Sequence, residues 1–126
     1  MAKKMQPVTD AEFSILEFLW DNGPATKREI VEALYPQCRD ADYSTVQKLL
    51  ERLEAKKNIQ RDRSSFAHVM RPTLSREKFA GRQLQAVADK LSGGSLVPLL
   101  IQLVEGKQIS SHDRKKIREL LDEQES

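Results

Sequence analysis

Hydrophobic residues recur with the period of an α-helix in three successive segments of the first half of the chain. The inward positions of the three segments are Phe13, Leu16, Leu19 and Trp20, then Ile30, Val31 and Leu34, and finally Val46, Leu49, Leu50 and Leu53. Thr9 with Glu12, and Thr26 with Glu29, have the spacing of capping boxes, which predicts where the first two helices begin. Glycine or proline follows each of these two segments and predicts its end.

The third segment predicts a helix over about residues 43–57. Its start is ambiguous, because either Asp42 or Ser44 could provide the N-terminal cap. At its other end, Lys57 or Asn58 is expected to take the left-handed conformation that often ends a helix.

After this predicted helix, the spacing of hydrophobic residues changes from the helical period to the alternation of a β-strand. Residues 59–63 and 66–71 alternate roughly between apolar and polar side chains around Ser64-Ser65, which predicts a two-stranded hairpin. Three helices followed by a hairpin is the order of elements in a winged helix-turn-helix, where the hairpin is the wing. We therefore predict a mainly α protein with a winged helix-turn-helix DNA-binding domain over residues 1–72.

Residues 73–126 show only helical patterns and predict a C-terminal helical domain. Ser75 is the expected cap of a helix with Ala80, Leu84, Val87, Ala88 and Leu91 on one face, and Ser110 is the expected cap of a last helix with Ile117, Leu120 and Leu121 inward. Between them, residues 95–105 are apolar nearly all round, more than so small a domain can bury alone. We therefore expect a two-fold homodimer. The candidate dimerisation residues are Leu96, Leu99, Leu100, Leu103 and Val104.

The net charge is only +2, so the distribution of charged residues along the chain is more informative than their sum. Acidic residues dominate from Asp10 to Glu32, and basic residues dominate from Ser44 to Arg63. A recognition helix needs short polar side chains near its start to meet base edges, and cations to meet phosphates. The candidate DNA-binding residues are Tyr43, Ser44, Thr45, Gln47 and Lys48 on the third helix, Arg52, Arg61 and Arg63 toward phosphates, and Lys27 and Arg28 at the start of the second helix. Lys3 and Lys4 could add positive charge near the N-terminus.

Other chemistry finds little support in the sequence. His68 and His112 lie in different segments without partners at metal-ligand or catalytic spacing, so we expect no enzyme activity, metal or cofactor. Cys38 is a lone thiol that we interpret as structural. Because neither a membrane span nor a signal peptide is evident, we expect a cytoplasmic protein.

Two stretches of the sequence resemble the penicillinase-repressor (BlaI/MecI-type) family. They are Val-Thr-Asp-Ala-Glu-Phe13 leading to Leu19-Trp20, and Tyr43-Ser-Thr-Val-Gln-Lys-Leu-Leu-Glu-Arg-Leu-Glu-Ala-Lys56. The resemblance runs almost end to end and implies a winged-helix dimer with interlocking C-terminal helices. It also implies repression of transcription by binding to double-stranded operator DNA, at inverted repeats with TACA/TGTA-like half-sites.

The resemblance also implies a way of releasing DNA. In antibiotic-responsive members a membrane sensor with a metalloprotease domain triggers cleavage of an Asn-Phe bond in the dimerisation helix, and the matching pair in this chain is Gln102-Leu103. Copper-responsive relatives carry a C-terminal cysteine cluster, which this chain lacks. Two alternatives remain open: a protein-interaction module on a winged-helix scaffold, and a small-molecule-responsive regulator of the multiple-drug-resistance type.

Overall fold

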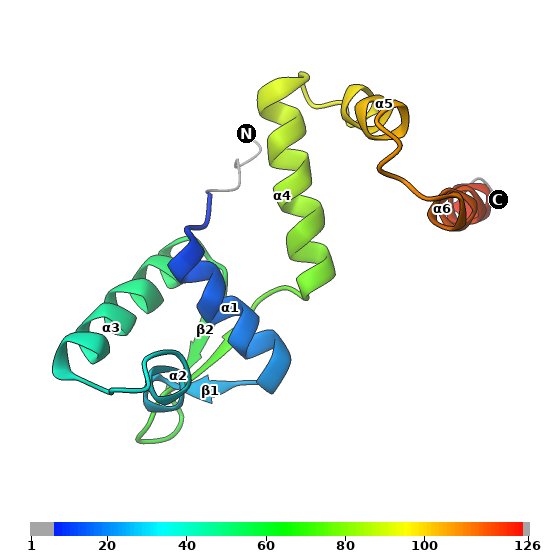
Figure 1. Cartoon of the computed structure of the whole chain (residues 1–126). Coiled ribbons are helices and arrows are strands. Elements are labelled where there is room, and N and C mark those ends of the chain that lie inside the picture. The colour runs from blue at the N-terminus through cyan, green and yellow to red at the C-terminus, as the bar shows by residue number, and fades with distance from the viewer. Residues whose placement is uncertain (1–6, 125–126) are drawn as a thin grey trace. The chain divides into compact units, whose positions relative to one another are not determined.

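Two capping boxes begin the first two helices of the computed structural model, which describes residues 7–124 (Figure 1). Helix α1 spans Asp10–Asn22, and helix α2 spans Lys27–Leu34. The hydroxyls of Thr9 and Thr26 each accept a hydrogen bond from the backbone N–H of the glutamate three residues later, at 3.2 Å in both cases. Both predicted boxes are thereby confirmed.

Helix α3 spans Asp40–Ala55 and begins earlier than predicted. The prediction of a cap at Asp42 or Ser44 was wrong. Asp42 lies inside the first turn, where its carboxylate accepts a hydrogen bond from the backbone N–H of Arg39 at 3.0 Å. Arg39 is therefore the residue that precedes the helix. After the helix, Lys57 has a φ of +64°, so the left-handed turn falls at this residue rather than at Asn58.

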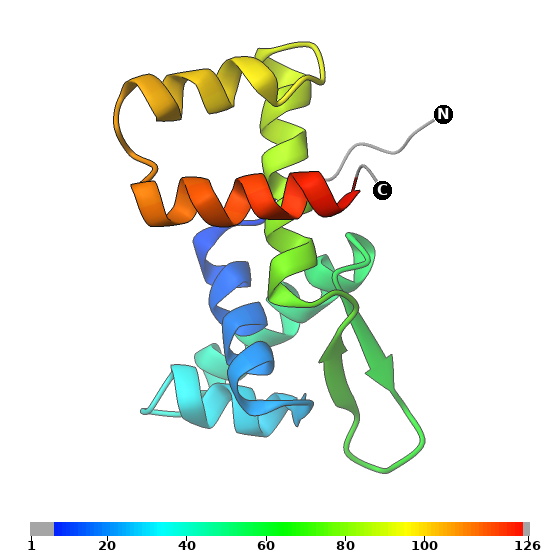
Figure 2. The same cartoon turned by 90° about the vertical axis from the view of Figure 1, so that its right-hand side faces the viewer.

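The sheet has three antiparallel strands in the order β1-β3-β2, one more than the predicted hairpin. Strands β2 (Ile59–Asp62) and β3 (Val69–Pro72) form the wing, and the two-residue strand β1 (Ala25–Thr26) pairs with β3. The second wing strand begins at residue 69 instead of 66, so the connecting loop is longer than predicted (Figure 2). Within that loop Ser64 donates its N–H to the Asp62 carboxylate at 2.9 Å, a local bond in place of a strand pair.

The core lies between α1, α2, α3 and the sheet, and it contains most of the predicted inward residues. The completely or almost completely buried side chains include Leu16, Leu19, Ile30, Val31, Val46, Leu50, Leu53 and Met70. Ile15 is also fully buried although the predicted stripe omitted it, whereas the predicted Phe13 is 37% exposed. Phe13 instead contacts Trp20 and Phe79 in an aromatic cluster, with ring centroids 5.3–6.3 Å apart.

The chain divides into two compact units, residues 1–83 and 84–126. The junction falls inside helix α4 (Arg76–Leu91), later than the predicted boundary after residue 72, because the first half of α4 packs on α1 through Phe79 and Trp20. Ser75 caps α4 by accepting the N–H of Lys78 at 3.2 Å, as predicted.

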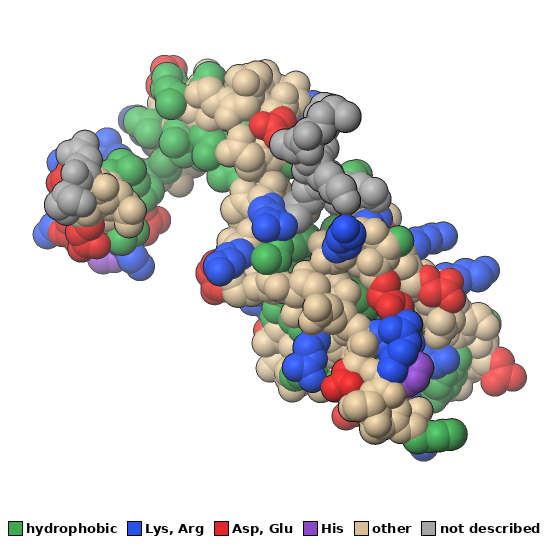
Figure 3. All heavy atoms as spheres, turned by 180° about the vertical axis from the view of Figure 1, so that it is seen from behind, with side chains coloured by type: hydrophobic (Ala, Val, Ile, Leu, Met, Phe, Trp, Pro, Cys, Tyr) green, Lys and Arg blue, Asp and Glu red, His purple; other side chains and the backbone are tan. Residues whose placement is uncertain are grey.

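The second unit contains the rest of α4, helix α5 (Val97–Glu105) and helix α6 (Ser111–Gln124). Ser110 caps α6 as predicted, by accepting the N–H of Asp113 at 3.1 Å. Apart from Ala88, the described part of this unit has no buried hydrophobic side chain. Its exposed large hydrophobic residues are Leu84, Val87, Leu91, Val97, Leu100, Ile101, Leu103, Val104, Ile117, Leu120 and Leu121. Hydrophobic side chains over α5 are visible at the upper left of Figure 3.

Candidate nucleic-acid interface

Helix α3 presents a polar face at its N-terminal half and its middle. Ser44, Thr45, Lys48 and Arg52 are all exposed on it. The hydroxyl of Thr45 donates to the carbonyl of Ala41 at 2.9 Å, which leaves its lone pairs free to accept. Within residues 7–124, Lys48 and Arg52 form no ion pair, so these cations are available to a ligand.

Gln47 connects this face to the start of α2. Its side-chain carbonyl accepts a hydrogen bond from Lys27 Nζ at 3.3 Å, and its amide donates to the Glu51 carboxylate at 2.9 Å. The predicted site residues Lys27 and Gln47 are therefore brought together, although they are far apart in the sequence. The amide keeps a second N–H with which it can donate to a base edge.

Two other predicted residues are more strongly engaged within the protein. Arg28 is exposed and pairs with Glu32 one turn later, with 2.9 Å between Nε and Oε1. Tyr43 is partly buried and packs against the core, so much of its ring supports the fold. Lys3 and Lys4 lie outside the described residues.

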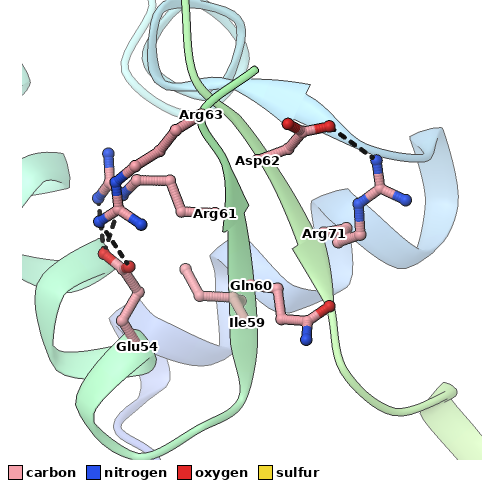
Figure 4. A pocket seen from close by; sticks show the side chains of 7 residues that line it. All are labelled: Glu54, Ile59, Gln60, Arg61, Asp62, Arg63 and Arg71. Atoms are coloured by element: carbon pink, nitrogen blue, oxygen red, sulfur yellow. Dashed lines mark hydrogen bonds and ion pairs between the residues drawn. The ribbon is translucent and has the colours of Figure 1, made fainter. Parts of the chain in front are cut away.

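The wing arginines both point toward Glu54, in the last turn of α3 (Figure 4). Arg61 donates to one Glu54 oxygen from Nε at 3.1 Å and from Nη2 at 2.7 Å, and Arg63 Nη2 lies 3.8 Å from the other oxygen. The hydrogen bonds from Arg61 hold the pKa of Glu54 below its ordinary value, against the opposing effect of burial. The prediction that Arg61 and Arg63 share one face of the wing is confirmed. On the other side of the wing, Arg71 pairs with Asp62 at 3.6 Å.

A groove of about 420 Å³ joins the start of α2, the middle of α3 and the wing loop. Its lining includes Lys27, Gln47 and Arg61, together with Phe66 and His68 from the loop. Phe66 is fully exposed. Phe66 and His68 were not among the predicted site residues. The prediction selected lysines, arginines and the polar face of a helix, and these two residues lie in a loop.

In the part of the chain that the structure describes, no three histidine, cysteine or acidic side chains are grouped so that they could hold a metal ion. None of the described helices has the length and apolar character needed to cross a membrane.

The three N-terminal helices and the winged sheet together define a winged helix-turn-helix protein. Comparison with known sequences identifies the particular family. The family model described as penicillinase repressor matches residues 8–123, so the chain belongs to the penicillinase repressor family, a family of transcriptional repressors.

Individual relatives match over nearly their whole length. The chain is 30% identical over 125 residues to the transcriptional regulator BlaI of Mycobacterium tuberculosis (strain ATCC 25618 / H37Rv), covering 98% of this chain and 88% of the relative. It is 20% identical over 123 residues to the penicillinase repressor of Staphylococcus aureus, covering 98% of this chain and 97% of the relative.

Proposed function

We propose that this protein is a dimeric transcriptional repressor that binds inverted-repeat operator DNA in the cytoplasm. Helix α3 enters the major groove, with Ser44, Thr45, Gln47 and Lys48 toward base edges. Arg52 and the wing contact phosphates, which supply most of the affinity.

The observation that carries this proposal is the exposed polar face of α3. Its short side chains, Ser44 and Thr45, are in the first half of the helix. Lys48 and Arg52, which form no ion pair within residues 7–124, follow one and two turns later. Short groups let a helix backbone approach the bases, and cations beyond them lie at the distance of the phosphates. This order of side chains favours DNA over a protein partner.

Dimerisation is supported by the exposed apolar residues of α5. Leu100 is 42% exposed and Leu103 is 39% exposed in the single chain. Apolar helix surface of this kind is stabilised when a second copy covers it, and a two-fold dimer presents two α3 helices to the two halves of an inverted repeat. Linking two weak half-site contacts raises the overall affinity by about 10²–10⁴.

Release of DNA follows from loss of the dimer. The Gln102-Leu103 bond lies in the exposed helix α5, so a signal-activated protease that cuts there would divide the proposed interface. A membrane sensor-protease is the partner that we propose for this step. Incubating the DNA-bound protein with such a protease tests this step: mass spectrometry of the products shows whether the Gln102-Leu103 bond is cut, and a cut elsewhere or no cut contradicts the proposal.

The proposed DNA-binding function is tested by selecting bound sequences from a random DNA pool. The selected duplex and a scrambled duplex are then titrated by fluorescence anisotropy at several salt concentrations. We expect an inverted repeat, two chains per duplex and an affinity that falls steeply with salt. If no motif is enriched and both duplexes bind equally weakly, the proposal is wrong and the α3 face is a surface for a protein partner.

A further inference from the structure

The wing and the recognition helix share one carboxylate, that of Glu54. Arg61 in β2 and Arg63 just after it approach this carboxylate from the wing side, and α3 supplies it from the other side (Figure 4). Arg61 makes two hydrogen bonds to it, at 3.1 and 2.7 Å. Only 11% of the Arg61 side chain is exposed, compared with 64% of the Arg63 side chain. The two arginines therefore differ in how available they are to a ligand.

The position of Glu54 is electrostatically unfavourable for a carboxylate. It lies in the last turn of α3, where the partial negative charge of the helix dipole favours cations. Arg61 provides the compensating charge, and both side chains are largely withdrawn from water. Breaking such a pair from one side leaves the other charge uncompensated, so that it moves toward solvent or toward another partner.

We infer that Glu54 is a positioning residue, which fixes the wing against the recognition helix and withholds Arg61 from DNA. Arg63 is then the wing cation that contacts a phosphate. This inference rests on the proposed DNA-binding function. Phosphate contacts strengthen binding to every sequence alike, so a cation held back from the backbone lowers sequence-independent binding and its dependence on salt.

The test removes the same ion pair from each side. In Glu54→Gln the charge that holds Arg61 is lost, so Arg61 becomes free for a phosphate in addition to Arg63. We expect about threefold tighter binding to a scrambled duplex and a plot of log affinity against log salt that is steeper by about 0.9, the effect of one added phosphate contact. The ratio of operator affinity to scrambled affinity should stay the same, because a phosphate contact strengthens both.

In Arg61→Gln the carboxylate keeps its charge and turns to Arg63, which already lies 3.8 Å away. The carboxylate then holds Arg63 in place of Arg61, so binding to the scrambled duplex should weaken and the salt plot should become shallower. A purely structural role predicts effects of the same sign in both variants, because each would loosen the wing. Opposite signs therefore separate positioning from mere support of the fold.

Matched controls account for the change in net charge. Glu17→Gln on α1 and Arg82→Gln on α4 alter the charge in the same directions at exposed positions outside the interface. If Glu54→Gln has the same salt slope as Glu17→Gln, or if Glu54→Gln and Arg61→Gln shift binding in the same direction, the inference is wrong. A wild-type protein that does not distinguish operator from scrambled DNA would instead refute the proposed function itself. Thermal melting of each variant shows that the compared proteins are folded.

Discussion

The two units of this chain differ in how far they bury their apolar side chains. Residues 1–83 enclose a hydrophobic core within one chain, with side chains such as Ile15, Ile30 and Leu50 completely inaccessible to solvent. In residues 84–126 the helices are equally well formed, yet the only buried hydrophobic side chain among the described residues is that of Ala88. Both units therefore form regular helices, but only the first unit covers the apolar faces of its helices within one chain.

Because of this difference, we expect the two units to be stabilised in different ways. Helices of 9 and 14 residues, such as α5 and α6, have little stability in water unless an apolar face is covered. The first unit should therefore respond to changes inside one chain. The second should respond to protein concentration, because its missing cover is, in our proposal, a second copy.

The largest expected effect is that of a charge in the apolar surface of α5. Leu100→Glu should dissociate the dimer and weaken operator binding by about 10²–10⁴, since each half-site contact then acts alone. Sedimentation velocity and anisotropy titration measure the two effects. Gln108→Glu, which adds the same charge in the exposed loop after α5, is the control and should leave both unchanged. An intact dimer with wild-type affinity in Leu100→Glu would remove the proposed distinction between the units.

In the first unit, the largest effect should come from the ion pair between Lys56 and Glu12. Lys56 Nζ lies 2.8 and 2.7 Å from the two carboxylate oxygens of Glu12, whose side chain is only 1% exposed. Lys56→Met leaves this buried charge unpaired and should lower the free energy of unfolding by about 3–5 kcal/mol. Urea unfolding measures the change at two protein concentrations.

Two variants control this prediction. Lys78→Met removes an exposed cation of the same unit and should have little effect. Glu12→Gln combined with Lys56→Met removes both charges and should recover part of the lost stability. If the single and double variants are equally destabilised, the cost arises from lost packing of the Lys56 side chain.

Acid should affect the first unit through the same carboxylates. Burial by itself raises the pKa of Glu12, but hydrogen bonds from Lys56 and Thr9 outweigh it and the pKa is lowered. Hydrogen bonds also lower the pKa of Asp42 and of Glu54. A lowered pKa in the folded state contributes stability that is present above the unfolded-state value, about 4.3 for glutamate, and is lost as the pH falls through the folded-state value. Urea midpoints should therefore decrease below about pH 4.3, and less so in Glu12→Gln.

The elements of the first unit were largely predictable from the sequence, because its signals act locally. The Thr9 and Thr26 capping boxes and the stripe of α3 involve residues within one or two turns of each other. Strand β1 was not predictable, since two residues contain no period and their pairing depends on β3, more than forty positions later. Similarly, the pattern did not predict that Ile15 is fully buried while Phe13 is partly exposed. Phe13 lies on the side of α1 against which α4 packs, and this contact is not local in the sequence.

The candidate site shows the same division. The exposure of Ser44 and Lys48 follows from the helical period, so their side of α3 was predictable. The burial of Arg61 was not predictable, because its charge is compensated by Glu54, which lies on another element. A count of basic residues along the sequence does not reveal which of them are already paired.

The smallest expected effect tests where the first unit ends. Trp20 Nε1 donates a hydrogen bond to the carbonyl of Leu74 at 2.9 Å, just before α4, and its ring lies 5.3 Å from that of Phe79 within α4. Trp20→Phe keeps an aromatic ring but loses the donor, which should cost about 1 kcal/mol.

Such a loss corresponds to a decrease of about 4–8 °C in Tm for a domain of 60–100 residues, which is measurable by circular dichroism. Phe66→Leu changes an aromatic residue at a fully exposed position and is the matched control. If Trp20→Phe melts like the wild type, the start of α4 contributes nothing to the first unit. If it melts earlier by the same amount at every protein concentration, the start of α4 belongs to the core that one chain completes by itself, and concentration should matter only beyond it.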